Sequence, residues 1–230
     1  MDIRSSVIRD RRAAASDESI SVAGSQIFGR GSHARGRGAA GATGDRPAQQ
    51  ITTIVLHQTA GAMIRGDSIV SVDSAITSHH RVDRIAAHFV ITVDGQAIYL
   101  RDVEFIMNNA GGRRGIDIEF CGRYRNSPTP EGNRLTPEAI RAGRQLVADL
   151  VAAIPTIRHI HPHGQVQSTP ASHDEEPGPK YHSCCGPDVW VNVGMWAESS
   201  LRLLTADTAP GYPNHGISPR QSNVAWRQEV

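Results

Sequence analysis

Histidine and cysteine are the residues of this sequence whose types and spacing could do chemistry. The chain of 230 residues contains 11 histidines, and five of them lie between His159 and His182. Imidazole is the commonest metal ligand in proteins and the usual general base near neutral pH, so this concentration indicates a functional site. Two adjacent thiols, Cys184 and Cys185, follow directly and extend the set of candidate ligands.

These residues favour an open zinc site over a structural one. A catalytic zinc ion takes three protein ligands and leaves the fourth position for water. His57 can supply the first ligand from far upstream, and His161 or His163 can supply the second. Cys184 or Cys185 can supply the third. The chain has no C-x-x-C spacing of the kind that closed four-ligand sites commonly use.

Apolar runs predict the strands that would position these ligands. Residues 51–57 are rich in β-branched side chains and end at a histidine, which is typical of a strand that presents a side chain at its end. Residues 87–93 and 96–100 are joined through Asp94 and Gly95, a strong hairpin signal.

A further strand is expected over residues 116–121, which alternate with a period of two. One face would carry Ile116, Ile118 and Phe120, and the other Asp117, Glu119 and Cys121. Helices are expected at 67–81, at 136–154 and at 188–204, the second one opened by a Thr-Pro-Glu start signal. A short strand over 157–161 and a polar loop over 162–186 separate the last two helices.

This order of elements predicts one α/β (α+β) domain, with a central mixed β-sheet flanked by helices. The domain is expected to span residues 49–205. Residues 1–48 are rich in Gly, Ala and Arg without an apolar period, and predict a flexible arm. Residues 206–230 are expected to form a C-terminal tail.

Composition excludes several other classes of protein. The net charge of +1 gives no electrostatic reason to expect nucleic-acid binding, and no apolar run approaches the length of a membrane helix. We therefore expect no nucleic-acid partner and no membrane insertion. The first ten residues lack the apolar core of a secretory signal, so synthesis in the cytoplasm is expected. Three cysteines are too few for a disulfide framework.

Four motifs in this sequence together resemble those of a known enzyme family. They are Ile-Val-Leu-His-Gln-Thr-Ala-Gly at 54–61, His-Phe-Val-Ile-Thr-Val-Asp-Gly at 88–95, Ile-Asp-Ile-Glu-Phe-Cys-Gly at 116–122 and Cys-Cys-Gly-Pro-Asp-Val-Trp at 184–190. In their order they resemble the motifs of the zinc-dependent N-acetylmuramoyl-L-alanine amidases (amidase type 2). That family includes phage amidase-lysozymes and peptidoglycan recognition proteins. The resemblance covers about residues 51–204 and implies the same fold.

Carried over position by position, the resemblance implies a Zn²⁺ site and a catalytic set. His57, His163 and Cys184 fall on the zinc ligands, and Glu119 falls on a glutamate that assists proton transfer. His182 stands where the family often has a lysine, and would stabilise the developing oxyanion; Lys180, the sole lysine, is its alternative.

Two further residues are expected to contact substrate, and several departures leave alternatives open. His88 would line the substrate groove, and Asn109 stands near a position where the family commonly has a substrate-contacting histidine. Cys185 replaces a proline and remains a rival ligand to Cys184, as His161 does to His163. A second near-match to the closing motif begins at Glu176, and Asp117 replaces a glycine, which adds a charge.

The implied activity is zinc-dependent hydrolysis of the amide between N-acetylmuramic acid and L-alanine in peptidoglycan. Such an enzyme would lyse cell walls, acting in the periplasm or outside the cell, as a phage endolysin or an antibacterial effector; a cytoplasmic recycling amidase is a third role. Peptidoglycan is the expected partner, with an immunity or secretion partner for an effector. The alternatives are a non-catalytic peptidoglycan-binding module and a zinc peptidase that cuts within the stem peptide.

Overall fold

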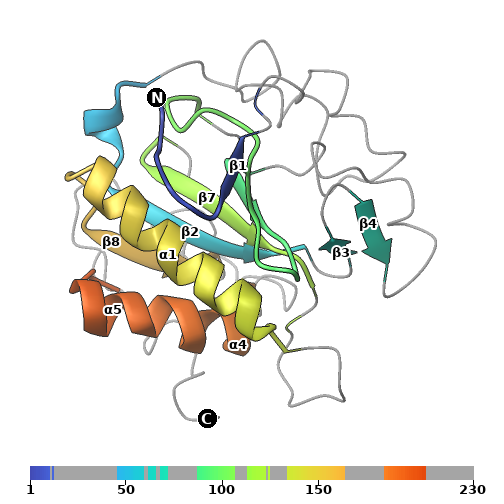
Figure 1. Ribbon diagram of the computed structural model, residues 1–230. Helices are drawn as coiled ribbons and strands as arrows, with labels where there is room; N and C mark the ends of the chain where they lie inside the picture. Colours follow the sequence, from blue (N-terminus) through green and yellow to red (C-terminus); the bar gives the residue numbers. More distant parts are fainter. Residues whose placement is uncertain are drawn as a thin grey trace, which may run out of the picture.

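A six-stranded mixed sheet forms the centre of the molecule, with helices packed along it (Figure 1). The computed structural model describes residues 1–10, 12, 46–59, 87–106, 113–122, 124, 134–163 and 184–205, together with the backbone of 62–65 and 68–71. The strand order is β1-β6-β5-β7-β2-β8. These strands are β1 (Ile8–Asp10), β2 (Thr53–Gln58), β5 (Phe89–Ile91), β6 (Ala97–Tyr99), β7 (Gly115–Phe120) and β8 (His159–Pro162).

Most of the strand pairs are parallel, which confirms the mixed sheet expected from the sequence. β5 and β6 form the antiparallel hairpin across Asp94 and Gly95, with Phe89 opposite Tyr99. β7 pairs in parallel with both β5 and β2, and β8 continues the parallel arrangement on the other side of β2. The carboxyl ends of β2, β7 and β8 therefore lie at the same end of the sheet.

A separate hairpin lies beside the sheet where a helix was expected. β3 (Ala62–Arg65) and β4 (Ser68–Ser71) pair with each other antiparallel and form their own two-stranded sheet. The prediction of a helix starting at Asp67 is thus wrong for residues 68–71, because the Ile69-Val70 pair favours an extended backbone once a partner strand is present. The remainder of that predicted helix lies outside the described residues.

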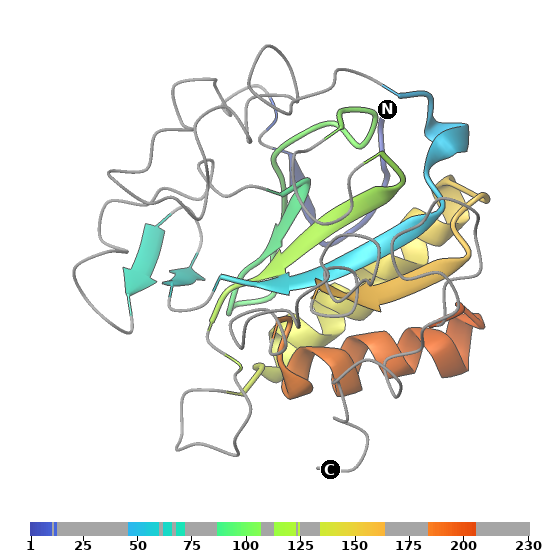
Figure 2. The ribbon, with the colours of Figure 1, turned by 180° about the vertical axis from the view of Figure 1, so that it is seen from behind.

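Two helical segments cover one face and one edge of the sheet. α1 (Pro137–Ala153) begins as expected, since the hydroxyl of its N-cap Thr136 accepts a hydrogen bond from the Ala139 amide. α4 (Pro187–Val189), the π-helical turn η5 (Trp190–Gly194) and α5 (Met195–Leu201) follow one another without a break and lie beside α1 (Figures 1 and 2). A short 3₁₀ turn, η3 (Ala48–Gln50), precedes β2.

Alternation along the strands divides the side chains between the two faces of the sheet. The face beneath α1 carries the main apolar core, to which Ile54, Leu56, Ile118 and Phe120 contribute along with Trp190 from η5. α1 comes so close that a Cβ on Gly143 would lie 2.7 Å from the Phe120 ring. The opposite face carries the polar residues of β2 and β7, flanked by a smaller apolar cluster formed by Ala87, Val90, Val93, Ile98, Leu100 and Cys121.

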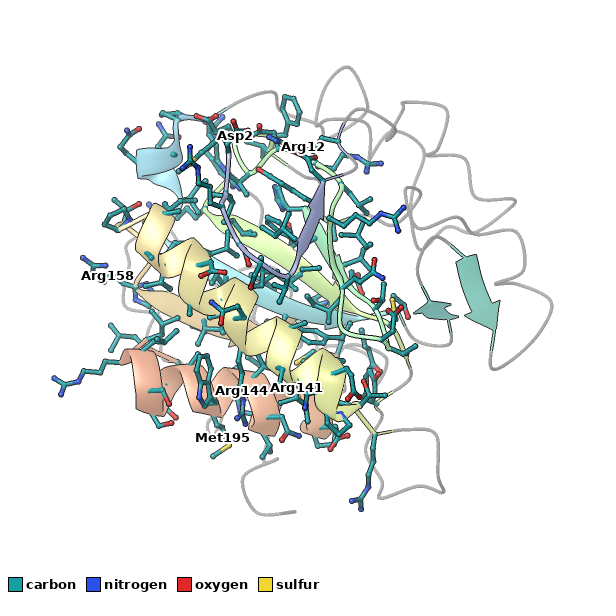
Figure 3. All side chains as sticks on the ribbon, viewed as in Figure 1. Asp2, Arg12, Arg141, Arg144, Arg158 and Met195 are labelled. Carbon is teal, nitrogen blue, oxygen red and sulfur yellow. The ribbon has the colours of Figure 1, made fainter. Side chains whose placement is uncertain are left out.

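The first ten residues are joined to the sheet through β1, which differs from the flexible arm expected for residues 1–48. β1 pairs in parallel with β6, and Ile3 is buried against the main core. The α-amino group of Met1 contacts the carboxylates of Asp102 and Glu104. Arg12 binds Asp2 at 2.8 Å at the same edge (Figure 3). The strand pairing and the contacts of Met1 join the segment to residues 89 to 103 positions away, which no local pattern reveals. Residues 13–45, like the predicted tail at 206–230, lie outside the described residues.

No helix within the described part of the chain has the length and apolar character needed to cross a lipid bilayer.

Candidate metal centre

Three side chains from distant parts of the sequence converge at the carboxyl end of the sheet. β2 and β8 are parallel neighbours with Leu56 opposite Pro162, so the residues that follow, His57 and His163, stand side by side. Their Nδ1 atoms are 3.0 Å apart. Cys184, which precedes α4, completes the group, and the candidate ligand atoms of the three residues all lie within 4.8 Å of one another.

The donor set and its dimensions fit a zinc ion. Zinc binds imidazole nitrogen and thiolate sulfur at about 2.0–2.3 Å, which for a tetrahedron places the ligand atoms about 3.3–3.6 Å apart. The Nδ1 atoms of the two histidines, 3.0 Å apart, are near this separation, and the candidate ligand atom of Cys184 lies within 4.8 Å of the other two. Among the described residues, these three form the one group of at least three His, Cys, Asp or Glu side chains that lie near enough to share a metal ion. With three protein ligands, a fourth position would remain for water.

The alternative ligands that the sequence left open lie in different surroundings. His163 belongs to the converging group. His161 lies two residues earlier, within β8, and its ring stacks on that of His159, with the ring centroids 6.0 Å apart. Cys184 also belongs to the group. Cys185 is wholly buried in the main core, and burial raises the pKa of its thiol well above the ordinary value.

His57 is held by a buried carboxylate on the side of its ring away from His163. Its Nε2 lies 2.9 Å from Oδ1 of Asp117, and both side chains are almost wholly buried. Burial opposes a charge on the imidazole. The hydrogen bonds to Asp117 and Cys184, with the negative charge of Glu119, outweigh burial and raise the pKa of His57 well above 6.5. Binding a metal ion would displace the proton from Nδ1.

Glu119 lies beside His57 on the adjacent strand, the two being directly in register. β7 is a central strand, and the Glu119 side chain is only 7% exposed, so this carboxylate is buried within the sheet. Its Oε2 makes no hydrogen bond to the described residues. Burial raises the pKa of Glu119 to about 7, with the charge of His57 opposing the shift and that of Asp117 adding to it. Such a carboxyl group can exchange a proton near neutral pH.

His88 lies in the interior of the protein. Its side chain is fully buried, Nε2 donates a hydrogen bond to the Phe105 carbonyl at 3.0 Å, and Nδ1 accepts one from the Asp117 amide at 3.0 Å. Both ring nitrogens are therefore used within the protein. Burial, with the positive charge of Arg46, lowers the pKa of His88 to about 4, so the ring is neutral and forms no ion pair with Asp117. In the described structure His88 supports the strand that carries Asp117, and its expected contact with substrate stays a prediction from the sequence.

The other residues expected at the site lie outside the described residues. They are His182, Asn109, Lys180 and Glu176. Their expected roles remain predictions from the sequence.

Two supporting features of the site were not expected from the sequence. Asp117 was noted as a departure from the family motif, but its contact with His57 follows from the register of two parallel strands. The second feature is the close packing of Gly186, which has φ +91°, on the backbone of Tyr124. This contact holds the segment that carries Cys184. Tyr124 in turn donates its amide proton to Gln58, next to His57. The Gly-Pro pair after the cysteines was the available signal for this turn.

Replacing Gly186 by alanine is expected to displace Cys184 and weaken metal binding. A Cβ at this position would lie 1.7 Å from the Tyr124 carbonyl oxygen, and the backbone conformation (φ +91°, ψ 153°) is one that essentially only glycine adopts. We expect a loss of at least ~2 kcal/mol in the free energy of unfolding, measured by urea denaturation, with weaker zinc binding in a chelator competition. Unchanged stability and unchanged zinc affinity would contradict the described turn.

Comparison with known proteins identifies the family of this chain. Residues 47–179 match the model of the N-acetylmuramoyl-L-alanine amidase family, which is more than half of the chain. The protein therefore belongs to the N-acetylmuramoyl-L-alanine amidases, as its motifs indicated. No curated protein matches the sequence.

The solved structures that match this chain include two endolysins and one peptidoglycan recognition protein. An endolysin amidase, LysCS, from Clostridium intestinale is 17% identical, with 73% of this chain and 93% of that chain covered and a TM-score of 0.46. The peptidoglycan recognition protein SD of Drosophila is 14% identical, with 76% and 90% covered and a TM-score of 0.44. The Ph2119 endolysin, from a bacteriophage of Thermus scotoductus, is 20% identical, with 70% and 91% covered and a TM-score of 0.40.

Proposed function

We propose that this protein is a zinc-dependent hydrolase that cleaves the amide bond between N-acetylmuramic acid and L-alanine in peptidoglycan. The observation that carries the proposal is the convergence of His57, His163 and Cys184, in a chain that belongs to the amidase family. The two imidazoles and the thiolate would hold the ion. When bound, zinc would polarise the scissile carbonyl and make water a better nucleophile.

The protein's own residues would move the proton. Glu119 lies in register with His57 and is buried, with a pKa of about 7, so it can accept the proton of the attacking water. As the C–N bond breaks, the same carboxyl group would return that proton to the nitrogen of L-alanine, which leaves as an amine. Water thus supplies the hydroxyl of the new carboxyl group and the proton of the new amine. We assign oxyanion stabilisation to His182, on the basis of its place in the sequence.

Lysis of bacterial cell walls is the proposed role, as an endolysin or an antibacterial effector. Peptidoglycan would be the substrate, encountered in the periplasm or outside the cell. An effector would also need a secretion machine for export and an immunity protein in the producing cell. The family membership of the chain supports the substrate class.

Digestion of purified peptidoglycan tests the proposal. The full chain would be incubated with cell walls after zinc loading and, in parallel, after removal of metal by a chelator, and the released fragments identified by mass spectrometry. Intact stem peptides with N-terminal L-alanine are expected with zinc and not after chelation. Cleavage inside the stem peptide would indicate a zinc peptidase instead. Binding to walls without hydrolysis in added zinc would indicate a recognition module.

A further inference from the structure

The carboxylate of Asp117 stands directly behind the candidate ligand His57. Asp117 lies on β7 opposite Val55 of β2, and its side chain has no exposed surface. Oδ1 is 2.9 Å from Nε2 of His57, while Nδ1 of the same ring is 3.0 Å from Nδ1 of His163. The imidazole of His57 is therefore held between a carboxylate on one side and the metal centre on the other.

This contact determines which nitrogen of His57 can bind a metal ion. An ionised carboxylate can accept hydrogen bonds but cannot donate them, so Nε2 must carry the proton that the contact uses. The lone pair available for a metal ion is then on Nδ1, the atom that faces His163 and Cys184. We propose that Asp117 is a positioning residue, which fixes His57 in the tautomer and orientation that the metal centre requires. The inference rests on the proposed zinc site and adds to it a residue that contacts a ligand rather than the metal ion.

A second histidine holds Asp117 in turn. His88 accepts a hydrogen bond from the Asp117 amide and donates one to the Phe105 carbonyl, each at 3.0 Å. Its Nδ1 is 3.6 Å from Oδ2 of Asp117, which is too long for a hydrogen bond. The ring thus anchors the backbone of β7 at the residue whose side chain reaches His57. A continuous series of contacts runs from Phe105 through His88 and Asp117 to His57.

The chemical identity of Asp117 matters because a negative charge strengthens the ligand. A carboxylate that accepts the second ring proton of a metal-bound histidine raises the basicity of the ligating nitrogen and fixes the ring, and its loss typically costs about 10–100-fold in metal affinity or activity. The family motif has glycine at this position, which offers no side-chain acceptor. Asp117 is therefore a feature of this chain rather than of the motif.

Zinc affinity, measured by competition with a chelating dye, tests the role of Asp117. Asp117→Asn keeps the shape of the side chain and removes its charge. We expect zinc binding to weaken about 10–100-fold in this variant. The control is Asp149→Asn, the same change on α1, where the carboxylate accepts a hydrogen bond from Gln145; its zinc affinity should equal that of the unmodified protein. Unchanged affinity in Asp117→Asn, with wild-type binding intact, would overturn the positioning role and leave the zinc site standing.

The tautomer of His57 provides a readout that does not depend on any variant folding. In the zinc-loaded wild-type protein, long-range ¹H–¹⁵N spectra of the imidazole rings should show His57 protonated at Nε2, with that proton strongly deshielded by the carboxylate. A ring protonated at Nδ1 would overturn the proposal. If the wild-type protein binds no zinc in the dye competition, the proposed function fails first, and the two failures are thereby distinguished.

Discussion

Cys184→Ser is expected to remove zinc from the protein, whereas Cys185→Ser is expected to retain it. The thiol of Cys184 belongs to the converging ligand group, and a serine hydroxyl is a poor replacement for a thiolate on zinc. Loss of a direct ligand should exceed the effect of losing a supporting residue, so we expect zinc affinity to fall by more than ~100-fold. Peptidoglycan hydrolysis should fall with it. Metal content after dialysis against a zinc buffer is the measurement.

Cys185→Ser is the matched control, because it makes the same chemical change at the next residue, which is not among the converging ligands. Its thiol is buried in the main core, with Sγ 3.8 Å from the Gly186 carbonyl oxygen. A hydroxyl there would be poorly satisfied, so the free energy of unfolding should fall by ~1–3 kcal/mol while zinc remains bound. The reverse pattern, in which Cys185→Ser loses zinc and Cys184→Ser keeps it, would show that the closing segment is aligned incorrectly.

Glu119→Gln is expected to abolish most hydrolysis without loss of zinc. The variant retains the size of the side chain but cannot accept the proton of the attacking water. General acid–base catalysis contributes about 10²–10⁴-fold, and the rate of peptide release should fall by that factor. Zinc content should be unchanged, because Glu119 is not among the converging ligands. A variant that hydrolyses walls at the wild-type rate would remove Glu119 from the mechanism.

The same substitution should stabilise the metal-free protein at high pH. Because the pKa of Glu119 is raised from 4.5 to about 7 in the fold, the folded state holds this proton more tightly than the unfolded state does. The contribution of Glu119 to wild-type stability therefore declines as the pH rises from 4.5 through 7, and the glutamine variant lacks this decline. The stability difference between variant and wild type should grow by on the order of 3 kcal/mol between pH 4 and pH 8. Urea denaturation in the presence of chelator measures it, and a constant difference would contradict the pKa shift.

Local patterns predicted most of the parallel core of this fold. β-branched runs and a period of two identified β2 and β7, the Asp-Gly pair identified the β5–β6 hairpin, and Thr136 marked the start of α1. The ligands followed from their positions after predicted elements and from the family motifs. These signals lie within a few residues of the features that they predict, which is why sequence reasoning could find them.

Features that depend on pairing between distant segments could not be predicted. β1 joins the sheet because β6 offers it a parallel edge, and nothing within residues 1–10 specifies that partner. The burial of His88 depends on the Phe105 carbonyl, and the contact of Asp117 with His57 depends on the register of β7 against β2. The alternation of apolar and polar residues in a single segment predicts the face on which a side chain lies. Which side chain it contacts on that face depends on the order and register of the assembled strands.

The candidate ligands lie at or next to the ends of regular elements: two parallel strands and a helix. The groups that would do the chemistry are therefore held by the scaffold, apart from the connecting segments that can vary. His57, His163 and Cys184 are positioned by β2, β8 and the start of α4, which all contribute residues to the main core. Connecting segments of a stable scaffold tolerate insertion and divergence far better than the scaffold itself. With the function proposed above, changes in the connections would alter the preference among cell-wall chemotypes, while the candidate ligands would stay where they are.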